Sequence, residues 1–183
     1  TRPVGLVTRI GYDFDPTFLY SRVIPEGIHV ISSKKTARST QTYHSKTDLT
    51  DRTISLEWGV APGLHPGDIP ESWLPHAQFI HIATMPPMQQ WRFLEFLKRK
   101  ASKAIISIDT DIHFLKDQKG RQNAIRNFQS AHLLFANRRE YEALWGVINN
   151  APKAIIKKDK EGAVYMEKGK ILEKSKADAV SVI

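Results

Sequence analysis

The sequence contains no cysteine, and this absence removes several classes of protein from consideration. Without cysteine there is no disulfide framework, and zinc sites built on thiolates are excluded. The seven histidines are scattered without an H-x-x-x-H pair, so the sequence offers no dedicated zinc site. The sequence also lacks an apolar run of about 18 residues and the basic, apolar and small-residue blocks of a signal peptide. These absences favour a cytoplasmic protein with no membrane partner.

The residues that are present fit one domain of ordinary size. The chain has 183 residues, of which 41% are apolar and 25% are charged, so it can bury a hydrophobic core. Its formal net charge of +8 raises the question of nucleic-acid binding. The densest basic segments, Lys98–Lys100 and Lys157–Lys160, are not interleaved with aromatic residues that stack on bases. We therefore expect no nucleic-acid partner.

The first third of the chain predicts short strands. We expect a buried strand at Gly5–Ile10 and a short helix at Thr17–Val23, which begins just after a proline. Three short segments with partial alternation, two of which contain threonine, then predict antiparallel strands with one solvated face. These segments are Ile28–Ile31, Thr40–His44 and Thr53–Trp58.

The remainder of the chain alternates strand and helix. Strands are expected at Phe79–Ala83, Ala104–Ile108 and Leu133–Ala136, with helices at Met88–Lys100 and Arg121–Ala131. This order predicts an α/β fold with a mainly parallel sheet covered on both faces by helices. The last segments predict a strand at Ala154–Ile156 and then a hairpin that turns at Lys168–Gly169.

The segment Asn137-Arg-Arg-Glu140 allows two interpretations. An asparagine at a helix N-cap and a glutamate three residues later form a capping box, in which each side chain satisfies a backbone N–H of the other. The same amide and carboxylate at a helix N-terminus could also organise a hydrated cation and the phosphates that it carries. Local sequence does not choose between them.

The position of this segment in the predicted fold favours a functional role. In open α/β sheets, ligands gather beyond the carboxyl ends of the strands. Asn137 and Glu140 follow one predicted strand, and Asp109 and Asp111 follow another. The candidate polar groups therefore share one edge of the sheet.

The order of motifs resembles the ribokinase-like, or PfkB, carbohydrate kinase family over nearly the whole chain. Five stretches match the family in sequence and in order. They are Val7-Thr-Arg-Ile-Gly-Tyr-Asp13-Phe, Asp51-Arg-Thr-Ile with Gly59-Val-Ala, Asp109-Thr-Asp-Ile-His113, Asn137-Arg-Arg-Glu140, and Lys157-Lys-Asp-Lys-Glu-Gly162-Ala. Within residues 1–183 the resemblance implies a ribokinase-like α/β/α kinase domain with a small β-sheet lid at residues 28–60.

The resemblance also implies a function. It implies an ATP-dependent kinase that phosphorylates a hydroxymethyl group of a sugar or nucleoside with the help of Mg²⁺. Asn137 and Glu140 would position the phosphates and the metal, with Glu140 as the metal-side carboxylate. Lys157 and Gly162 would lie at the nucleotide.

Three residues depart from the family pattern. Asp111 stands where the family has asparagine, His113 where it often has arginine, and Asp159 where it usually has the first glycine of G-x-x-G. Asp109, Asp111 and His113 are the candidates on the substrate side. Because a neutral imidazole cannot make the bidentate contact that arginine makes with a carboxylate, we expect a neutral sugar or nucleoside rather than a sugar acid.

The family's amino-terminal G-G motif and its D-T-x-G-A-G-D motif, which carries the catalytic base, are not found in this sequence. We therefore name no catalytic residue and expect an incomplete portion of a kinase, inactive alone, that ends with a strand at Val180–Ile183. The alternative is a non-catalytic ribokinase-fold module for binding or interaction. The identity of the phosphate acceptor stays open, and the free edges of a lid sheet favour pairing with a second copy.

Overall fold

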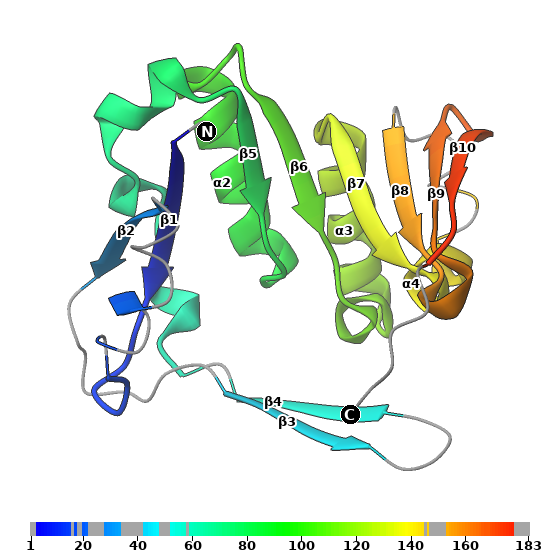
Figure 1. Cartoon of the computed structure of the whole chain (residues 1–183), viewed down its shortest axis with the longest axis horizontal. Coiled ribbons are helices and arrows are strands. Elements are labelled where there is room, and N and C mark those ends of the chain that lie inside the picture. Colours follow the sequence, from blue (N-terminus) through cyan, green and yellow to red (C-terminus); the bar gives the residue numbers. More distant parts are fainter. Residues whose placement is uncertain are drawn as a thin grey trace. The chain divides into compact units, whose positions relative to one another are not determined.

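The computed structural model describes residues 3–15, 17, 20–21, 28–33, 42–47, 52–57, 59–144, 146 and 153–177. The chain divides into two compact units, Thr1–Pro70 and Glu71–Ile183 (Figure 1). The predicted helix at Thr17–Val23 lies only partly within the described residues, and the predicted strand at Val180–Ile183 lies outside them. In the described part of the chain, every helix is too short or too polar to cross a membrane.

The first unit contains two separate pairs of strands. Strand β1 (Val4–Arg9) pairs in parallel with β2 (Ile28–Ser33), and β3 (Thr42–Thr47) pairs with β4 (Arg52–Glu57) in an antiparallel ladder. The prediction of antiparallel pairing is therefore confirmed for β3 and β4 and is wrong for β2. A short strand with partial alternation suits either kind of ladder, so the composition of β2 could not identify its partner. The lid at residues 28–60 stays a prediction.

Two short 3₁₀ helices complete the described part of this unit. Helix η1 covers Ala61–Gly63, and η2 covers Pro66–Asp68 with His65 at its N-cap. The guanidinium of Arg9, at the end of β1, lies 3.1 Å from the carboxylate of Asp68 and also donates a second hydrogen bond to it. This bidentate ion pair ties the end of β1 to η2.

The second unit is built on a six-stranded sheet with the order β10-β9-β8-β7-β6-β5. The four strands from β5 to β8 are parallel, whereas β9 and β10 are antiparallel additions at one edge. The predicted α/β class with a mainly parallel sheet is confirmed. The strands are β5 (Phe79–Ile82), β6 (Ile105–Asp109), β7 (Leu133–Asn137), β8 (Lys153–Lys157), β9 (Ala163–Glu167) and β10 (Lys170–Ser175).

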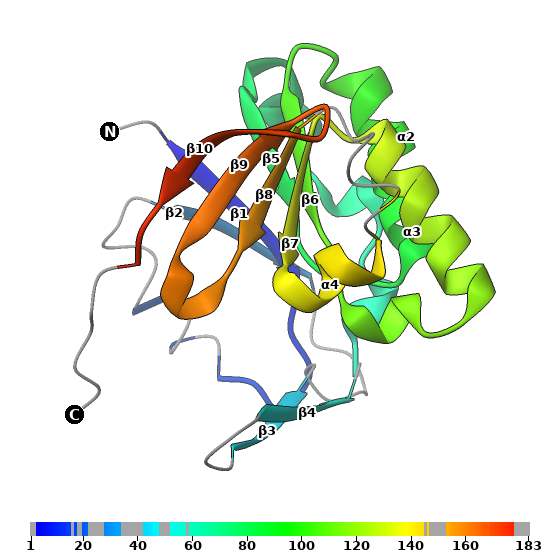
Figure 2. The same ribbon diagram turned by 90° about the vertical axis from the view of Figure 1, so that its right-hand side faces the viewer.

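Both long helices of this unit lie on the same face of the sheet (Figure 2). Helix α2 (Pro87–Lys100) and α3 (Gln118–Ser130) pack beside each other, and the short α4 (Arg138–Ala143) follows β7. The remaining helices are the 3₁₀ segments η3 (Glu71–His76), η4 (Ile112–Leu115) and η5 (Asp159–Glu161).

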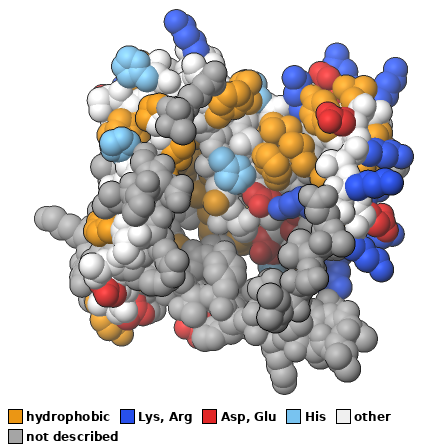
Figure 3. Space-filling model, in the orientation of Figure 1, with side chains coloured by type: hydrophobic (Ala, Val, Ile, Leu, Met, Phe, Trp, Pro, Cys, Tyr) orange, Lys and Arg blue, Asp and Glu red, His pale blue; other side chains and the backbone are white. Residues whose placement is uncertain are grey.

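The hydrophobic core lies between these two helices and the sheet. The largest fully buried apolar side chains come from α2, α3, the central strands and the end of α4: Leu94, Leu97, Ile106, Ile108, Phe128, Leu134, Leu144 and Ile156. Burial of each such side chain contributes on the order of 2 kcal/mol to folding. The opposite face is less covered, because Phe79 is 68% exposed and Ile105 is 43% exposed. Among the described residues of this unit, neither long helix covers that face, where hydrophobic side chains are visible in Figure 3.

The predicted hairpin is confirmed. Strands β9 and β10 pair in an antiparallel ladder across a turn at Lys168 and Gly169. Both turn residues have positive φ, 47° for Lys168 and 75° for Gly169. Positive φ at both central residues is the backbone requirement of a type I′ hairpin turn, which matches the twist of the strands.

Candidate functional site

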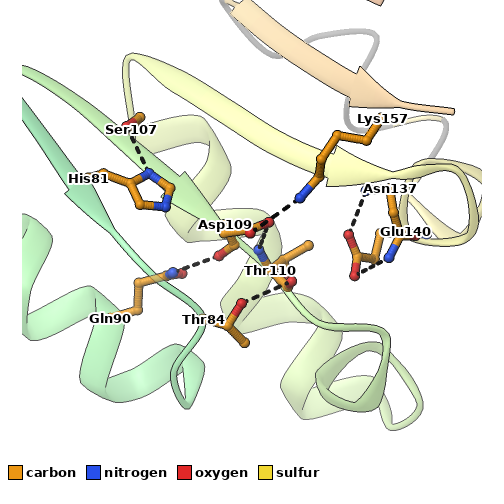
Figure 4. A network of polar contacts seen from close by, with 9 residues as sticks. All are labelled: His81, Thr84, Gln90, Ser107, Asp109, Thr110, Asn137, Glu140 and Lys157. Carbon is orange, nitrogen blue, oxygen red and sulfur yellow. Dashed lines mark hydrogen bonds and ion pairs between the residues drawn. The ribbon is translucent and has the colours of Figure 1, made fainter. Parts of the chain in front are cut away.

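The register of the parallel strands brings three polar residues to the same end of the sheet. Asp109 pairs with Phe135 between β6 and β7, and Asn137 pairs with Lys157 between β7 and β8. Because side chains alternate along a strand, residues 135 and 137 point to the same face. Asp109, Asn137 and Lys157 therefore share one face at the carboxyl ends of the strands, as Figure 4 shows. The prediction that Asp109 and Asn137 share one edge of the sheet is confirmed, and Lys157 lies at the same edge.

Asn137 and Glu140 form the capping box that the sequence predicted. The Asn137 side-chain oxygen accepts a hydrogen bond of 3.0 Å from the Glu140 backbone N–H. In return, the Glu140 carboxylate accepts bonds of 2.7 Å from the Asn137 backbone N–H and 2.7 Å from the Asn137 side-chain amide. Each carboxylate oxygen thus already has one donor. A carboxylate oxygen has more than one lone pair, so capping leaves room for a further ligand.

The Glu140 carboxyl group is strongly perturbed. Glu140 is only 5% exposed, and this burial raises the pKa of its carboxyl group from 4.5 to about 7. The hydrogen bond from the Asn137 backbone and the charge of Lys157 oppose this rise in pKa, whereas the charges of Asp109 and Asp111 add to it. A buried carboxyl group that interacts with carboxylates from another strand end is a common feature of functional sites.

Lys157 makes the contact that joins two strand ends. Its ammonium Nζ lies 3.4 Å from Asp109 Oδ2. The Lys157 side chain is 50% exposed and that of Asp109 is 24% exposed, so the pair is partly solvated. Such a pair adds little to stability, and the ammonium group keeps access to solvent and to an anionic ligand.

Asp111 and His113 lie one loop further on and contact each other. Asp111 caps η4, because its Oδ1 accepts a bond of 2.8 Å from the His113 backbone N–H. The same oxygen lies 2.6 Å from His113 Nδ1. The effect of Asp111 on the pKa of Glu140 places its charge near the site. The His113 side chain is 49% exposed.

Gly162 has a backbone role that its sequence motif did not reveal. It has a φ of 90°, and a Cβ atom there would lie 1.9 Å from the Ser175 carbonyl oxygen. Its own carbonyl accepts a bond of 2.7 Å from the Lys158 N–H. Gly162 therefore allows the chain to turn from η5 into β9 close to Lys157. The Asp159 side chain, a departure from the family pattern, lies outside the described part of the chain.

Sequence reasoning missed Gln90, Asn127, Thr84 and Thr110. Gln90 Nε2 donates a bond of 2.8 Å to the Asp109 carbonyl, and Thr84 Oγ1 lies 3.4 Å from the Thr110 carbonyl (Figure 4). A signal was present in both helices. The buried face of α2 is Gln90, Phe93, Leu94 and Leu97, and that of α3 is Ala124, Asn127 and Phe128. A polar residue on each buried face marks a position that packing alone does not explain.

The donor set fits a magnesium ion held mainly by a ligand's phosphates. Among the described residues, no three histidine or carboxylate side chains converge to hold a metal ion. Mg²⁺ commonly uses one or two carboxylates, keeps several waters and takes its other oxygens from substrate phosphates. Glu140 would be such a carboxylate, and the partly exposed ammonium group of Lys157 would be a cation for the phosphates.

Comparison with known sequences agrees with this geometry. Residues 2–183 match the model of the pfkB family carbohydrate kinases. A cytidine kinase of Thermococcus kodakarensis is 30% identical to the chain over 141 residues, which cover 75% of the chain and 48% of that protein. The chain thus spans about half the length of this relative.

Comparison with solved structures supports the same fold. An Escherichia coli protein assigned as a ribokinase II, in complex with ATP and Mg²⁺, has a TM-score of 0.74 and 14% identity, covering 99% of this chain and 64% of its own. Adenosine kinase from Schistosoma mansoni, in complex with 2-fluoroadenosine, has a TM-score of 0.74 and 16% identity, covering 98% and 62%. The fold, the order of motifs and the family match over residues 2–183 agree, and the chain therefore belongs to the pfkB family of carbohydrate kinases.

Proposed function

We propose that the full-length natural protein is an ATP-dependent kinase that phosphorylates a hydroxymethyl group of a nucleoside or neutral sugar. The observation that supports this proposal most directly is the convergence of Asp109, Glu140 and Lys157 at the carboxyl edge of the sheet of a pfkB-family chain. Phosphoryl transfer depends mainly on positioning and on neutralising charge, and these groups can do both.

The three groups would have different tasks. Lys157 would place a positive charge beside the phosphates of the nucleotide, and in the absence of nucleotide it would pair with the Asp109 carboxylate. Glu140, with Asn137 fixing its carboxylate, would hold the water shell of Mg²⁺. When bound, Mg²⁺ supplies positive charge that stabilises the negative charge of the transferring phosphoryl group. Gly162 would allow the turn from η5 into β9 that holds the chain next to Lys157.

The acceptor is best sought among nucleosides and neutral sugars. The relative from Thermococcus kodakarensis is a cytidine kinase, which supports a nucleoside. His113 supports the same choice, because it lacks the forked donor that arginine offers to the carboxylate of a sugar acid. Asp109 and Asp111 lie on the same side and would face the acceptor. Residues 28–60 would act as the lid over it, and pairing of two lids would make a homodimer.

The alternative function is a non-catalytic ribokinase-fold module for binding. The match to the carbohydrate kinase family over residues 2–183 and the 30% identity to a cytidine kinase both support catalysis. We therefore favour the kinase.

A substrate panel tests the proposal. The full-length natural protein is incubated with ATP and magnesium chloride and with nucleosides, neutral sugars and sugar acids, and release of ADP is measured. We expect turnover with at least one nucleoside or neutral sugar. Preference for an aldonic or keto acid would contradict the substrate assignment. Binding of nucleotide without release of ADP above background for any acceptor would support the non-catalytic module instead.

A further inference from the structure

A chain of buried amide groups connects helix α3 to the end of β6. The Asn127 side-chain amide, which is fully buried, donates bonds of 3.0 Å to Gln90 Oε1 and 2.8 Å to the Pro87 carbonyl. Gln90, which is 3% exposed, then donates a bond of 2.8 Å to the Asp109 carbonyl. Three elements of the fold, α3, α2 and β6, are thus linked by side-chain amides inside the core.

This arrangement is costly for stability alone. The Asn127 side-chain oxygen is buried and has no hydrogen-bond partner among the described residues. A buried polar group without a partner lowers stability, and apolar side chains of similar size would pack the same space without that cost. Phe93, Leu94 and Leu97 do so on the same face of α2. A role beyond packing would explain why the amides lie there.

The chain of amides ends at the residue whose carboxylate enters the candidate site. Asp109 presents its carbonyl oxygen to Gln90 and its side chain to Lys157 (Figure 4). The second carboxylate oxygen, Oδ1, accepts a bond of 3.0 Å from the Thr110 N–H. At the next peptide group, Thr84 Oγ1 lies 3.4 Å from the Thr110 carbonyl. The backbone of residues 109 and 110 is therefore held from two elements while the carboxylate projects toward β8.

We propose that Gln90 is a positioning residue, which fixes the backbone at Asp109 and so aims the Asp109 carboxylate at Lys157 and the phosphate site. Asn127 holds the Gln90 amide in the orientation that donates to Asp109, because it occupies Gln90 Oε1. This inference rests on the proposed function, since it assigns a task to groups that serve the kinase site.

Paired substitutions separate positioning from simple packing. The variants are Gln90→Met, Asn127→Leu and the double variant Gln90→Met/Asn127→Leu, each made in the full-length natural protein. Asn127→Leu leaves Gln90 Oε1 without its partner, and Gln90→Met removes the donor to the Asp109 carbonyl. The double change replaces both side-chain amides with apolar groups of similar size, so that only backbone carbonyls lose a donor. We expect the double variant to melt no lower than Gln90→Met.

Two measurements are made on each variant, with the wild type beside them. The first is turnover with Mg-ATP and the best acceptor, with kcat and KM determined separately. The second is hydrogen exchange at the Thr110 amide, the donor to Asp109 Oδ1. We expect the double variant to lose kcat by roughly tenfold to a hundredfold, as for a small misplacement of a reacting geometry, and to exchange the Thr110 amide faster.

The outcomes distinguish the two proposals. A double variant with wild-type melting temperature, kcat and Thr110 exchange would overturn the positioning role. If the wild type has no kinase activity, the proposed function fails. The inference about Gln90 is then still tested, because unchanged exchange of the Thr110 amide in the double variant overturns it. If the double variant does not fold, Thr84→Val removes only a partly buried hydroxyl donor to the next peptide group, at the Thr110 carbonyl. The positioning model then requires faster Thr110 exchange and lower kcat with an unchanged melting temperature.

Discussion

The ammonium group of Lys157 lies 3.4 Å from the carboxylate of Asp109, although 48 residues separate them in the sequence. The contact spans two strand ends, because β7 lies between β6 and β8 in the sheet. The charges of both residues act on the pKa of Glu140: the Asp109 carboxylate raises it and the Lys157 ammonium group lowers it. Removal of either charge should therefore change the pKa of Glu140, and this change can be measured.

Replacement of Lys157 by methionine should raise the pKa of Glu140 above about 7, because the lysine charge lowers it in the wild type. The apparent affinity for Mg-ATP should fall roughly tenfold, the usual effect of losing a hydrogen bond to a charged group. Carboxyl ¹³C titration by NMR gives the pKa, and calorimetry gives the affinity. Lys158→Met is the matched control, and equal effects from both variants would contradict a specific role for Lys157.

The stability of the ligand-free protein should fall as pH rises from about 4.5 to about 7. Burial raises the pKa of Glu140 to about 7, so in this range the folded state holds a proton that the unfolded state releases. The contribution is on the order of 3 kcal/mol, fully present below pH 4.5 and lost above pH 7. Denaturant titrations of the wild type and Glu140→Gln at several pH values isolate it. Superimposable pH profiles would show that Glu140 is not buried as described.

The same substitution should lower turnover far more than it lowers stability at pH 7. Glutamine keeps a side chain that can accept a hydrogen bond at the capping position, but it lacks the charge that a hydrated cation needs. We expect a loss of roughly a hundredfold or more in kcat/KM for Mg-ATP. Glu142→Gln, an exposed position on the same helix, is the control. A lower melting temperature with unchanged turnover would reduce the motif to helix capping.

The wild-type pH profile gives an independent reading of the same group. Because kcat/KM reports the ionisation of the free enzyme, it should rise with pH through about 7 if the Glu140 carboxylate is required. The Glu140→Gln variant should lack this rise.

Replacement of Gly162 by alanine should destabilise the second unit. The glycine has a φ of 90°, and an added Cβ would lie 1.9 Å from the Ser175 carbonyl oxygen. We expect a loss of about 2 kcal/mol or more in the free energy of unfolding. Chemical denaturation measures it, with Gly146→Ala as control, because among the described residues no atom outside its chain neighbours and local helix backbone lies within 4 Å of the Cβ added there. If the variant has wild-type stability but binds nucleotide more weakly, Gly162 serves ligand binding and not folding.

The sequence alone predicted most elements of the second unit and the type of its fold. Short apolar segments marked the strands, and helical spacing marked α2 and α3 within a few residues of their bounds. These patterns are local, so they can be read without knowing the fold. The capping box of Asn137 and Glu140 is local in the same sense, because its two side chains are three residues apart.

Strand partners were harder to predict. Strand β2 pairs in parallel with β1, whereas its short, partly alternating sequence suggested an antiparallel partner. Pairing depends on which segments meet in space, and β propensity carries no information on direction.

Only the tertiary structure decided which polar groups act together. Asp109 and Lys157 become neighbours through the register of three strands, and Gln90 reaches Asp109 from a helix on the other face of the sheet. The high pKa of Glu140 has the same origin, because burial and the charges of distant residues cause it. Sequence fixes the chemistry of each side chain, but distance and desolvation set the strength of their interactions, and both arise only when the chain is folded.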